Sequence, residues 1–237
     1  MEAAGYATLT RQTGLMREMQ MIANNIANAA TTGYRAEGMI FSEFVARAEG
    51  APSLSMARGN TPVTSQVQGS MEATGGTFDF AIEGAGFFLI DTPEGERLTR
   101  GGAFALSGEG DLVTMDGFRV LDAGGAPVFI PPDAGRPGLG ADGTLSADGR
   151  PLAQLGLFQP VEGAALIRVG GNLFESRGAI VPVEDGKIIQ GFREGSNVEP
   201  LTEMARMIEV QRAYEMGQSF LEAEHERIRR ALDTFTR

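Results

Sequence analysis

Few residues of this chain could support catalysis. The single histidine, His225, lies between Glu224 and Glu226, and there is no cysteine. One histidine without cysteine cannot supply the usual ligand set of a zinc site, and a Ser–His–Asp triad would have to use the same side chain. We therefore expect His225 to occupy a solvated helix position, and we predict no catalytic residue, no metal site and no cofactor.

Three other patterns have a chemical interpretation. The Gly-Ala-Gly run at 84–86 lacks the third glycine and the following helix of a dinucleotide-binding fingerprint. The Asp-Gly pairs at 142–143 and 148–149 resemble calcium-binding turns but suit tight hairpin turns better. Acidic residues are numerous enough to supply a carboxylate pair for glycan cleavage, although most lie in turns. A β-domain glycan hydrolase, or a calcium-dependent binding module with oligomerisation helices, is therefore the alternative to a structural protein.

The composition narrows the possible partners. The chain has 237 residues, and 31 acidic against 20 basic side chains give a formal net charge of −11. A protein of that sign repels phosphate groups, so we expect neither a nucleic-acid partner nor attachment to anionic membranes. No window approaches the ~18 apolar residues of a membrane helix, and the N-terminus lacks the pattern of a Sec signal peptide. We expect a soluble protein that is exported without such a signal.

Residues 2–30 are predicted to form a helix. They contain no proline, and Leu15, Met19, Ile22 and Ile26 recur at spacings of four, three and four, which places them on one helix face. The glycine of the following Thr31–Gly33 run can take the left-handed conformation that ends helices.

Residues 201–235 are predicted to form a second, longer helix. Pro200 suits a first helical turn, and Asn197 or Glu199 could cap it. An apolar or aromatic residue recurs every seven positions, which is typical of a coiled coil. These heptad residues are Met207, Tyr214, Leu221, Ile228 and Phe235, with Met204 on an adjacent strip. At ~1.5 Å per residue the helix would be roughly 50 Å long, far more than one face of a small domain needs.

The middle of the chain has a different character. Residues 35–76 are polar and poorly periodic, and we expect an extended or irregular connector. From residue 77 to 197, short β-like runs alternate with Asp-Gly and Gly-Gly turn signals, which predicts an antiparallel all-β domain. The predicted fold class is α+β, with residues 1–34 and 198–237 forming a helical coiled-coil domain around this β-rich centre.

Three asparagines near the end of the first helix are unusual, because asparagine is a weak helix former. Asn24, Asn25 and Asn28 lie within five residues. Fraying before the helix stop is one explanation. The other is that the small alanines between them allow close helix approach while the amides bond neighbouring chains.

Both ends of the chain resemble the terminal signatures of the flagellar rod and hook family, the axial proteins of the bacterial basal body. The N-terminal run is ANNIANAATTGYR, the C-terminal run is SNVEPLTEMARMIEVQRAYE, and FAIEGAGFFLI and LTRGGAF are similar to the family's central segment. The length and the YRAEGMIFSEF continuation most resemble the members that build the proximal rod, with the distal-rod members as the alternative.

The resemblance implies a mechanical role. Such a subunit would reach the rod, which crosses the periplasm, through the flagellar export apparatus, and would assemble there with copies of itself and other rod proteins. The terminal helices would line the inner tube as a coiled coil. The residues expected in subunit packing are Leu15, Met19, Ile22, Asn24, Asn25, Ile26, Asn28, Thr32, Gly33, Tyr34, Met204, Met207, Gln211, Arg212, Tyr214, Leu221, Ile228 and Phe235.

Overall fold

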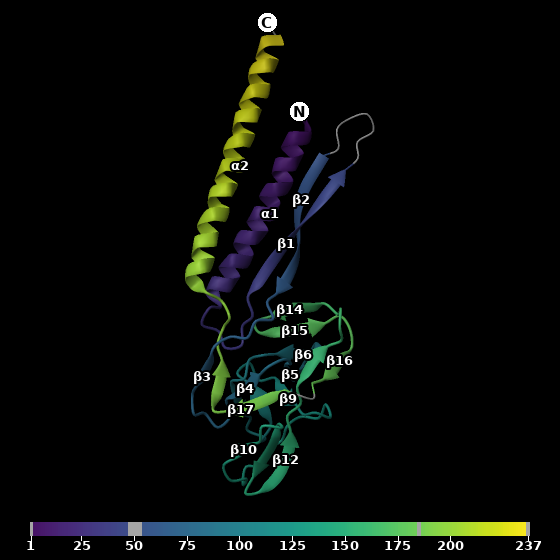
Figure 1. Cartoon of the computed structure of the whole chain (residues 1–237), viewed down its shortest axis with the longest axis vertical. Helices are drawn as coiled ribbons and strands as arrows, with labels where there is room; N and C mark the ends of the chain where they lie inside the picture. The colour runs from purple at the N-terminus through teal and green to yellow at the C-terminus, as the bar shows by residue number, and fades with distance from the viewer. Residues whose placement is uncertain (1, 47–53, 184–185, 236–237) are drawn as a thin grey trace. The chain divides into compact units, whose positions relative to one another are not determined.

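The computed structural model describes residues 2–46, 54–183 and 186–235, with side chains described at 8–40, 63–183 and 186–233. These residues form two compact units (Figure 1). The helical unit comprises Met1–Ala27, Glu37–Ser65 and Glu199–Arg237, and the β unit comprises Asn28–Ala36 and Gln66–Val198. No helix in the described ranges is both long enough and apolar enough to cross a membrane.

The helical unit contains two helices and a hairpin. Helix α1 spans Glu2–Ala27 and α2 spans Pro200–Phe235, while strands β1 (Glu37–Ala46) and β2 (Leu54–Thr64) pair antiparallel. Helix α1 contacts both α2 and β2. An isolated hairpin is marginally stable in water, so packing on the helix stabilises it. The hairpin lies within the segment predicted as a connector, and its polar, weakly periodic sequence gave no strand signal.

The observed helix ends differ slightly from the predicted ones. Helix α1 ends three residues early, because the Thr31 amide donates to the Asn28 carbonyl at 3.0 Å in a turn. Gly33 is therefore six residues past the helix and is not its C-terminal stop. Helix α2 begins at Pro200, and its Glu203 amide donates to the Glu199 carbonyl at 3.0 Å.

The β unit is built from short antiparallel strands, as predicted. Seven of them form one sheet in the order β14-β15-β6-β5-β9-β8-β7, and the others pair in twos and threes. The strands are β3 (Met71–Ala73), β4 (Phe80–Glu83), β5 (Phe88–Thr92), β6 (Gly95–Thr99), β7 (Phe104–Leu106), β8 (Leu112–Thr114), β9 (Arg119–Leu121), β10 (Gly138–Leu139), β11 (Thr144–Ala147), β12 (Arg150–Gln154), β13 (Phe158–Pro160), β14 (Leu166–Gly170), β15 (Leu173–Ser176), β16 (Ile180–Pro182), β17 (Lys187–Gln190) and β18 (Phe192–Glu194).

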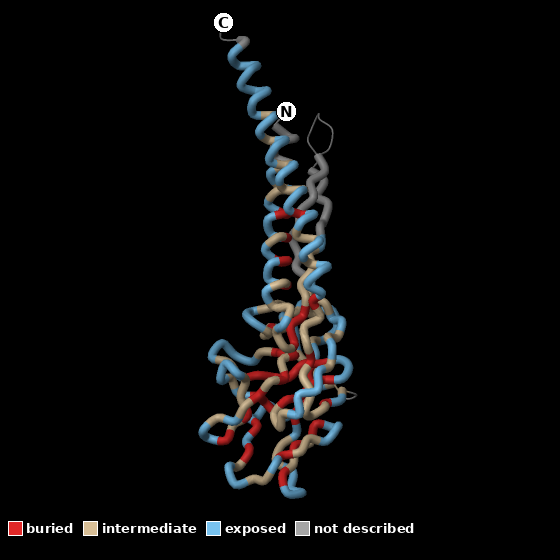
Figure 2. The backbone as a smooth tube through the Cα atoms, turned by 90° about the vertical axis from the view of Figure 1, so that its left-hand side faces the viewer, coloured by how far each residue is buried: buried red, intermediate tan, exposed pale blue. Residues whose placement is uncertain are grey.

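Strand β5 separates two cores of the β unit. Its side chains alternate across the sheet, so Phe88 and Ile90 enter one apolar cluster and Leu89 enters the other. Figure 2 shows the buried residues of this unit as red segments of the tube. Because the two faces of the sheet are both covered, the central strand is apolar at three successive positions.

The described parts of the chain thus have an α+β fold with two helices and many antiparallel strands, which confirms the predicted class. The β unit is closed by distant segments, since β3 pairs with β18 and β4 pairs with β17.

Candidate functional site

Helices α1 and α2 pack on each other through the predicted stripes. Leu15 and Ile22 are buried in one cluster with Met21 and Val210. Five further predicted residues lie at its margin, half-buried: Met19, Ile26, Met207 and Tyr214 contact the cluster, and Leu221 continues the same face of α2. The stripe on each helix therefore has a partner within this chain over the first half of α2.

The second half of α2 has no such cover among the described residues. Ile228 is 44% exposed, and Leu232 on the same face is 61% exposed. Figure 1 shows α2 running beyond the start of α1. Figure 2 shows most of this part of the tube as exposed. The side chain of Phe235, the last predicted heptad residue, lies outside the described side chains.

Asn25 is the most constrained of the predicted asparagines. It is fully buried, and its Oδ1 accepts from the Glu37 amide at 3.0 Å while its Nδ2 donates to the Glu37 carbonyl at 2.9 Å. The Nδ2 also donates to Glu203 Oε1 at 3.3 Å. The amide therefore joins α1, the start of β1 and the start of α2 inside one helical unit.

The remaining polar residues of the predicted set divide by exposure. Asn24, Gln211 and Arg212 are exposed, as is Met204. Asn28 is half-buried, and its Oδ1 accepts from the Thr31 hydroxyl at 3.1 Å. Asn28 therefore serves the turn after α1.

An ion pair between the helices was not predicted. The carboxylate of Glu18, which is 7% exposed, accepts from Arg206 Nε at 3.0 Å and from Nη2 at 2.8 Å. Both nitrogens donate to the same oxygen, Glu18 Oε1, and a hydrogen bond between ionised groups is stronger than a neutral one. The signal was an acid on the apolar side of α1, four residues before Ile22.

The predicted residues Thr32, Gly33 and Tyr34 belong to the β unit. Gly33 has φ +68°, and a Cβ there would lie 2.4 Å from the backbone carbon of Arg100. The ring of Tyr34, which is 2% exposed, is covered by the guanidinium of Arg168 at 4.2 Å. The Thr32 carbonyl accepts from the Asn172 side-chain amide. The segment after α1 is thus packed into the β unit at each of these positions.

A buried polar cluster lies directly after this segment. The carboxylate of Glu194 pairs with Arg35 Nη2 at 2.8 Å and with Arg100 Nη2 at 2.7 Å, and all three side chains are at most 5% exposed. Gly69 adds its backbone amide to the same carboxylate at 3.1 Å. We call Arg35, Arg100 and Glu194 the arginine–glutamate triad.

Burial lowers the pKa of Arg100 to about 10, because removing a cation from water disfavours its charged form, and the Glu194 carboxylate opposes the shift. Burial lowers the pKa of Arg35 for the same reason. The Arg100 guanidinium therefore stays charged at neutral pH. With one carboxylate between two cations, the triad depends on its hydrogen bonds to backbone carbonyls for the rest of its stabilisation.

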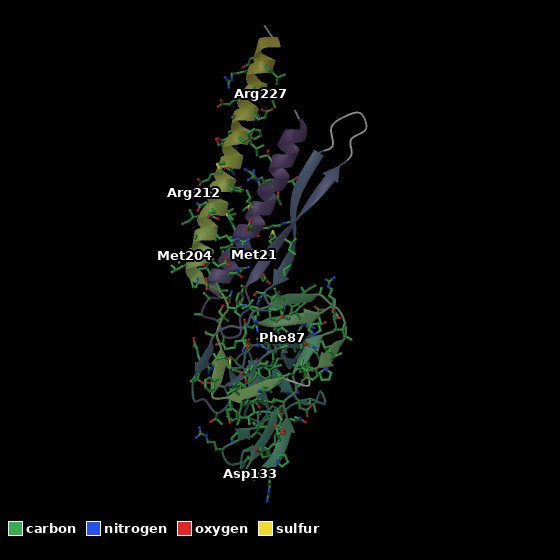
Figure 3. The ribbon with its side chains drawn as sticks, viewed as in Figure 1. Met21, Phe87, Asp133, Met204, Arg212 and Arg227 are labelled. Carbon is green, nitrogen blue, oxygen red and sulfur yellow. The ribbon has the colours of Figure 1, made fainter. Side chains whose placement is uncertain are left out.

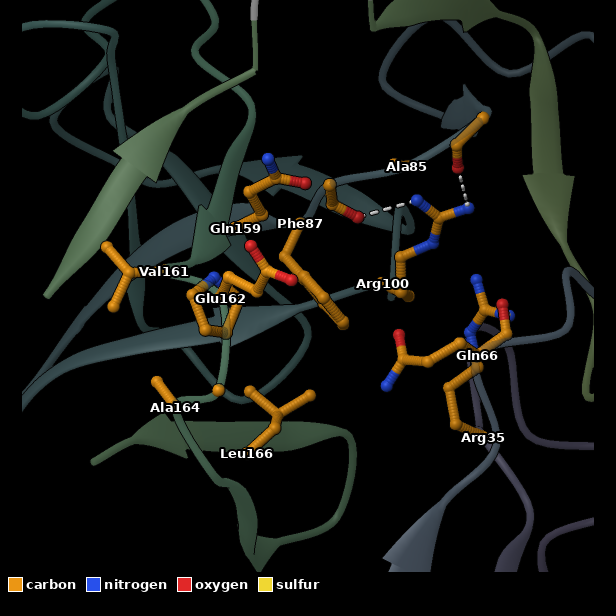
Figure 4. Close-up of a pocket in the computed structure, with 14 residues that line it drawn as sticks. Arg35, Gln66, Ala85, Phe87, Arg100, Gln159, Val161, Glu162, Ala164 and Leu166 are labelled. Carbon is orange, nitrogen blue, oxygen red and sulfur yellow. Dashed lines mark hydrogen bonds between the residues drawn. The ribbon is translucent and has the colours of Figure 1, made fainter. Parts of the chain in front are cut away.

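The triad borders an open recess of about 340 Å³ (Figure 4). Arg100 donates from Nη1 to the Gly86 carbonyl at 2.6 Å and from Nη2 to the Gly84 carbonyl at 3.0 Å. Phe87 and Leu166 contribute apolar wall to the same recess. Its arginines are engaged in holding backbone, so this recess is bounded by a structural network.

The patterns considered for catalysis give no assembled site in the described part of the chain. No group of three His, Asp or Glu side chains there could hold a metal ion. His225 is exposed on α2. The Asp142 carboxylate accepts from the Thr144 amide at 3.1 Å and from its hydroxyl at 2.8 Å, which is a hairpin-turn arrangement.

Asn197 completes the connection between the two terminal signatures. Its Oδ1 accepts from the Ala36 amide at 2.6 Å, its Nδ2 donates to the Val67 carbonyl at 2.7 Å, and its own amide donates to the Tyr34 carbonyl at 3.2 Å. It was predicted only as a possible helix cap. The residues that sequence reasoning missed, Arg35, Arg100 and Glu194, lie in or beside the quoted motifs, whose charged residues were the available signal.

Comparison with known proteins gives three family matches along the chain. A model described as flagella basal body rod protein matches residues 9–35, the flagellar hook protein FlgE/F/G D1 domain matches 81–147, and the flagellar basal body rod FlgEFG protein C-terminal model matches 189–234. Each matched segment contributes one member of the triad.

Several curated relatives are similar over nearly the whole chain. The flagellar basal-body rod protein FlgF of Mesorhizobium japonicum is 41% identical over 218 residues, and that of Caulobacter vibrioides is 40% identical over 226 residues. Each alignment covers 91% of this chain and 90% of the relative. The flagellar basal-body rod protein FlgG of Bacillus subtilis is 30% identical over 244 residues, covering 91% and 92%.

The chain belongs to the flagellar basal-body rod protein family. This membership confirms the resemblance seen in the motifs, the structural role and the prediction that the protein is not an enzyme, and it places the protein in the flagellar basal body.

Proposed function

We propose that this chain is a subunit of the proximal rod, the part of the flagellar drive shaft nearest the motor. The higher identity to the FlgF relatives than to the FlgG relative supports this position, and the distal rod is the alternative. Its partners are copies of itself and other rod proteins. The flagellar export apparatus delivers the chain to the rod that crosses the periplasm.

The uncovered half of the α2 stripe carries this proposal. Leu221 is half-buried against its own unit, whereas Ile228 and Leu232 remain 44% and 61% exposed on the same heptad face. Fully burying an aliphatic side chain contributes about 1.5–3 kcal/mol. A helix that presents an apolar heptad beyond its own partner is suited to a coiled coil with a neighbouring subunit.

We assign a separate role to each part of the chain. The terminal helices α1 and α2 form the inner assembly domain, and the strands within residues 77–197 form an outer β domain. The packing of α1 on α2 supports an inner pair of helices. The net charge of −11 supports an outer surface that stays soluble.

The test is incorporation of stripe variants into basal bodies. Leu221→Asp and Ile228→Asp each place a charge on the proposed interface, and Ser219→Asp places the same charge on an exposed position of α2. We expect the two stripe variants to be absent from purified basal bodies and the cells to lose swimming, while the control variant assembles.

Circular dichroism of the purified variants should show an unchanged β unit. Normal incorporation of both stripe variants would refute the coiled-coil role. A reconstruction of the rod that places this chain on the hook side would refute the proximal position and favour the distal one.

A further inference from the structure

A second apolar surface lies on the first part of α2. Leu201, Met204 and Ile208 recur at spacings of three and four and are 79%, 45% and 51% exposed. Ile208 and the buried Val210 are two residues apart, about 200° around the helix, so this surface faces away from α1. Figure 3 shows Met204 on that side of α2. We call these three residues the ridge.

Further along the same helix, α1 and α2 leave a groove of about 360 Å³. The small residues Ala213 and Gly217 line it, one helical turn apart. Met216 and Phe220 also line it and are 66% and 49% exposed. The groove is lined by Thr8, Arg11, Gln12, Leu15, Ala213, Met216, Gly217 and Phe220.

Gly217 allows a close approach of the two helices beside this groove. Glycine inside a helix costs about 1 kcal/mol relative to alanine. A Cβ at this position would lie 3.1 Å from Gln12 Nε2, and that same amide donates to the Tyr214 carbonyl at 3.3 Å. The glycine therefore lets the side chain of α1 lie close against α2 and leaves the adjacent space open.

The ridge and the groove cannot meet within one molecule. Ile208 and Phe220 lie twelve residues apart on one continuous helix, which is ~18 Å along its axis at ~1.5 Å per residue. Their charges are complementary between molecules. The groove carries the cation Arg11, and the exposed charges within four residues of the ridge, Glu199, Glu209 and Arg212, sum to −1.

We propose that the ridge of one copy packs into the groove of a second copy of this chain. The two surfaces differ, so each copy offers an unused ridge and an unused groove after pairing. Such a head-to-tail contact does not close on itself and produces an open helical row of subunits. The inference rests on the proposed rod function and specifies which surfaces join neighbouring copies.

Crosslinking in assembled basal bodies tests the contact. The chain has no cysteine, so introduced thiols are unique. We combine Ile208→Cys with Phe220→Cys in a chain that replaces the native one, treat purified basal bodies with a short bis-maleimide, and blot for this protein. We expect a ladder of oligomers from the double variant and monomers from each single variant.

A matched pair, Ile208→Cys with Glu222→Cys, keeps one thiol on the ridge and moves the other to an exposed position outside the groove, and it should give no ladder. Dimers from Ile208→Cys alone would show a symmetric contact and overturn the proposal, as would an incorporated double variant without a ladder. Absence of the native chain from basal bodies would instead overturn the proposed function.

A second measurement tests the same contact if the cysteine variants incorporate poorly into basal bodies. Ile208→Glu and Phe220→Glu replace exposed side chains, so both proteins should fold with unchanged circular dichroism but be lost from basal bodies. Glu222→Gln should incorporate normally. Normal incorporation of both Glu variants would overturn the proposal.

Discussion

Arg100 and Glu194 lie 94 residues apart in the chain and form an ion pair of 2.7 Å in which both side chains are 1% exposed. Arg35 meets the same carboxylate at 2.8 Å. One buried anion thus holds two cations from separate family-matched segments, and the closure of the β unit depends on it.

Replacing that anion should unfold the β unit readily. Glu194→Gln leaves two buried guanidinium groups without a counter-charge, and breaking a buried ion pair in this way costs about 3–5 kcal/mol. Urea denaturation followed by circular dichroism measures the loss. Glu83→Gln, at an exposed position on β4, is the control and should leave the midpoint unchanged. Equal midpoints for Glu194→Gln and the native protein would contradict the role of the triad.

Gly33→Ala should destabilise the β unit more than the same replacement of a glycine that has a positive φ but open space around it. The added Cβ would meet the Arg100 backbone at 2.4 Å, and the left-handed conformation itself costs about 1–2 kcal/mol. Gly117 has φ +84° and no atom within 4 Å of a built Cβ, so Gly117→Ala isolates the conformational cost. Thermal melting should show the larger decrease in Tm for Gly33→Ala. A larger decrease for Gly117→Ala would contradict the close packing.

Asn25→Asp should destabilise the helical unit in a pH-dependent way. A carboxylate there cannot donate to the Glu37 carbonyl and would face Glu203, so its pKa in the folded state would rise above the ordinary value of about 3.9. The stability of the variant is then fully present below the pKa that the introduced carboxyl has in the unfolded chain. It is lost as the pH rises through the higher pKa of that carboxyl in the folded state. Denaturation at several pH values, with the exposed Asn24→Asp as control, measures this. A pH-independent loss would contradict it.

Thr144→Val should raise the pKa of Asp142. The backbone amide of Thr144 lowers this pKa most and its hydroxyl lowers it further, and the substitution removes only the hydroxyl. Because the folded-state pKa is lowered, the associated stability is present above the unfolded pKa and is lost as pH falls. An NMR titration of the carboxyl carbon should show a higher pKa that still lies below the ordinary value. An unchanged pKa would rule out a contribution from the hydroxyl.

The helices could be predicted closely because their signals are local. The heptad places α2 within one residue of its observed start, and the stripe of Leu15 and Ile22 identifies the face of α1 that packs on α2. The end of α1 was predicted three residues late, because the Asn28–Thr31 turn competes with the helix. Short apolar runs between glycine turns likewise predicted the strands of the β unit.

Long-range polar contacts could not be predicted in this way. No periodicity connects Arg35 or Arg100 to Glu194, so the triad leaves no local pattern in the sequence. Two explanations were considered for Asn25, helix fraying or a bond from its amide to a neighbouring chain, and the structure shows the amide bonded to Glu37 and Glu203 of its own chain. Gly33 was expected to end a helix, and its positive φ instead allows the chain to lie on the Arg100 backbone. Asn25 and Gly33 were identified from the sequence, but the partner of each depended on the tertiary fold.

The bonding of Asn197 to Ala36 and Val67 has a consequence for the order of folding. These contacts join the first and last parts of the β unit, and their loop-closure entropy must be overcome before they stabilise anything. A polypeptide that emerges from a narrow opening with its N-terminus first cannot complete the unit until residue 197 is free. Until then strands β3 and β4 lack their partners β18 and β17, so the β unit is completed only when nearly the whole chain is present.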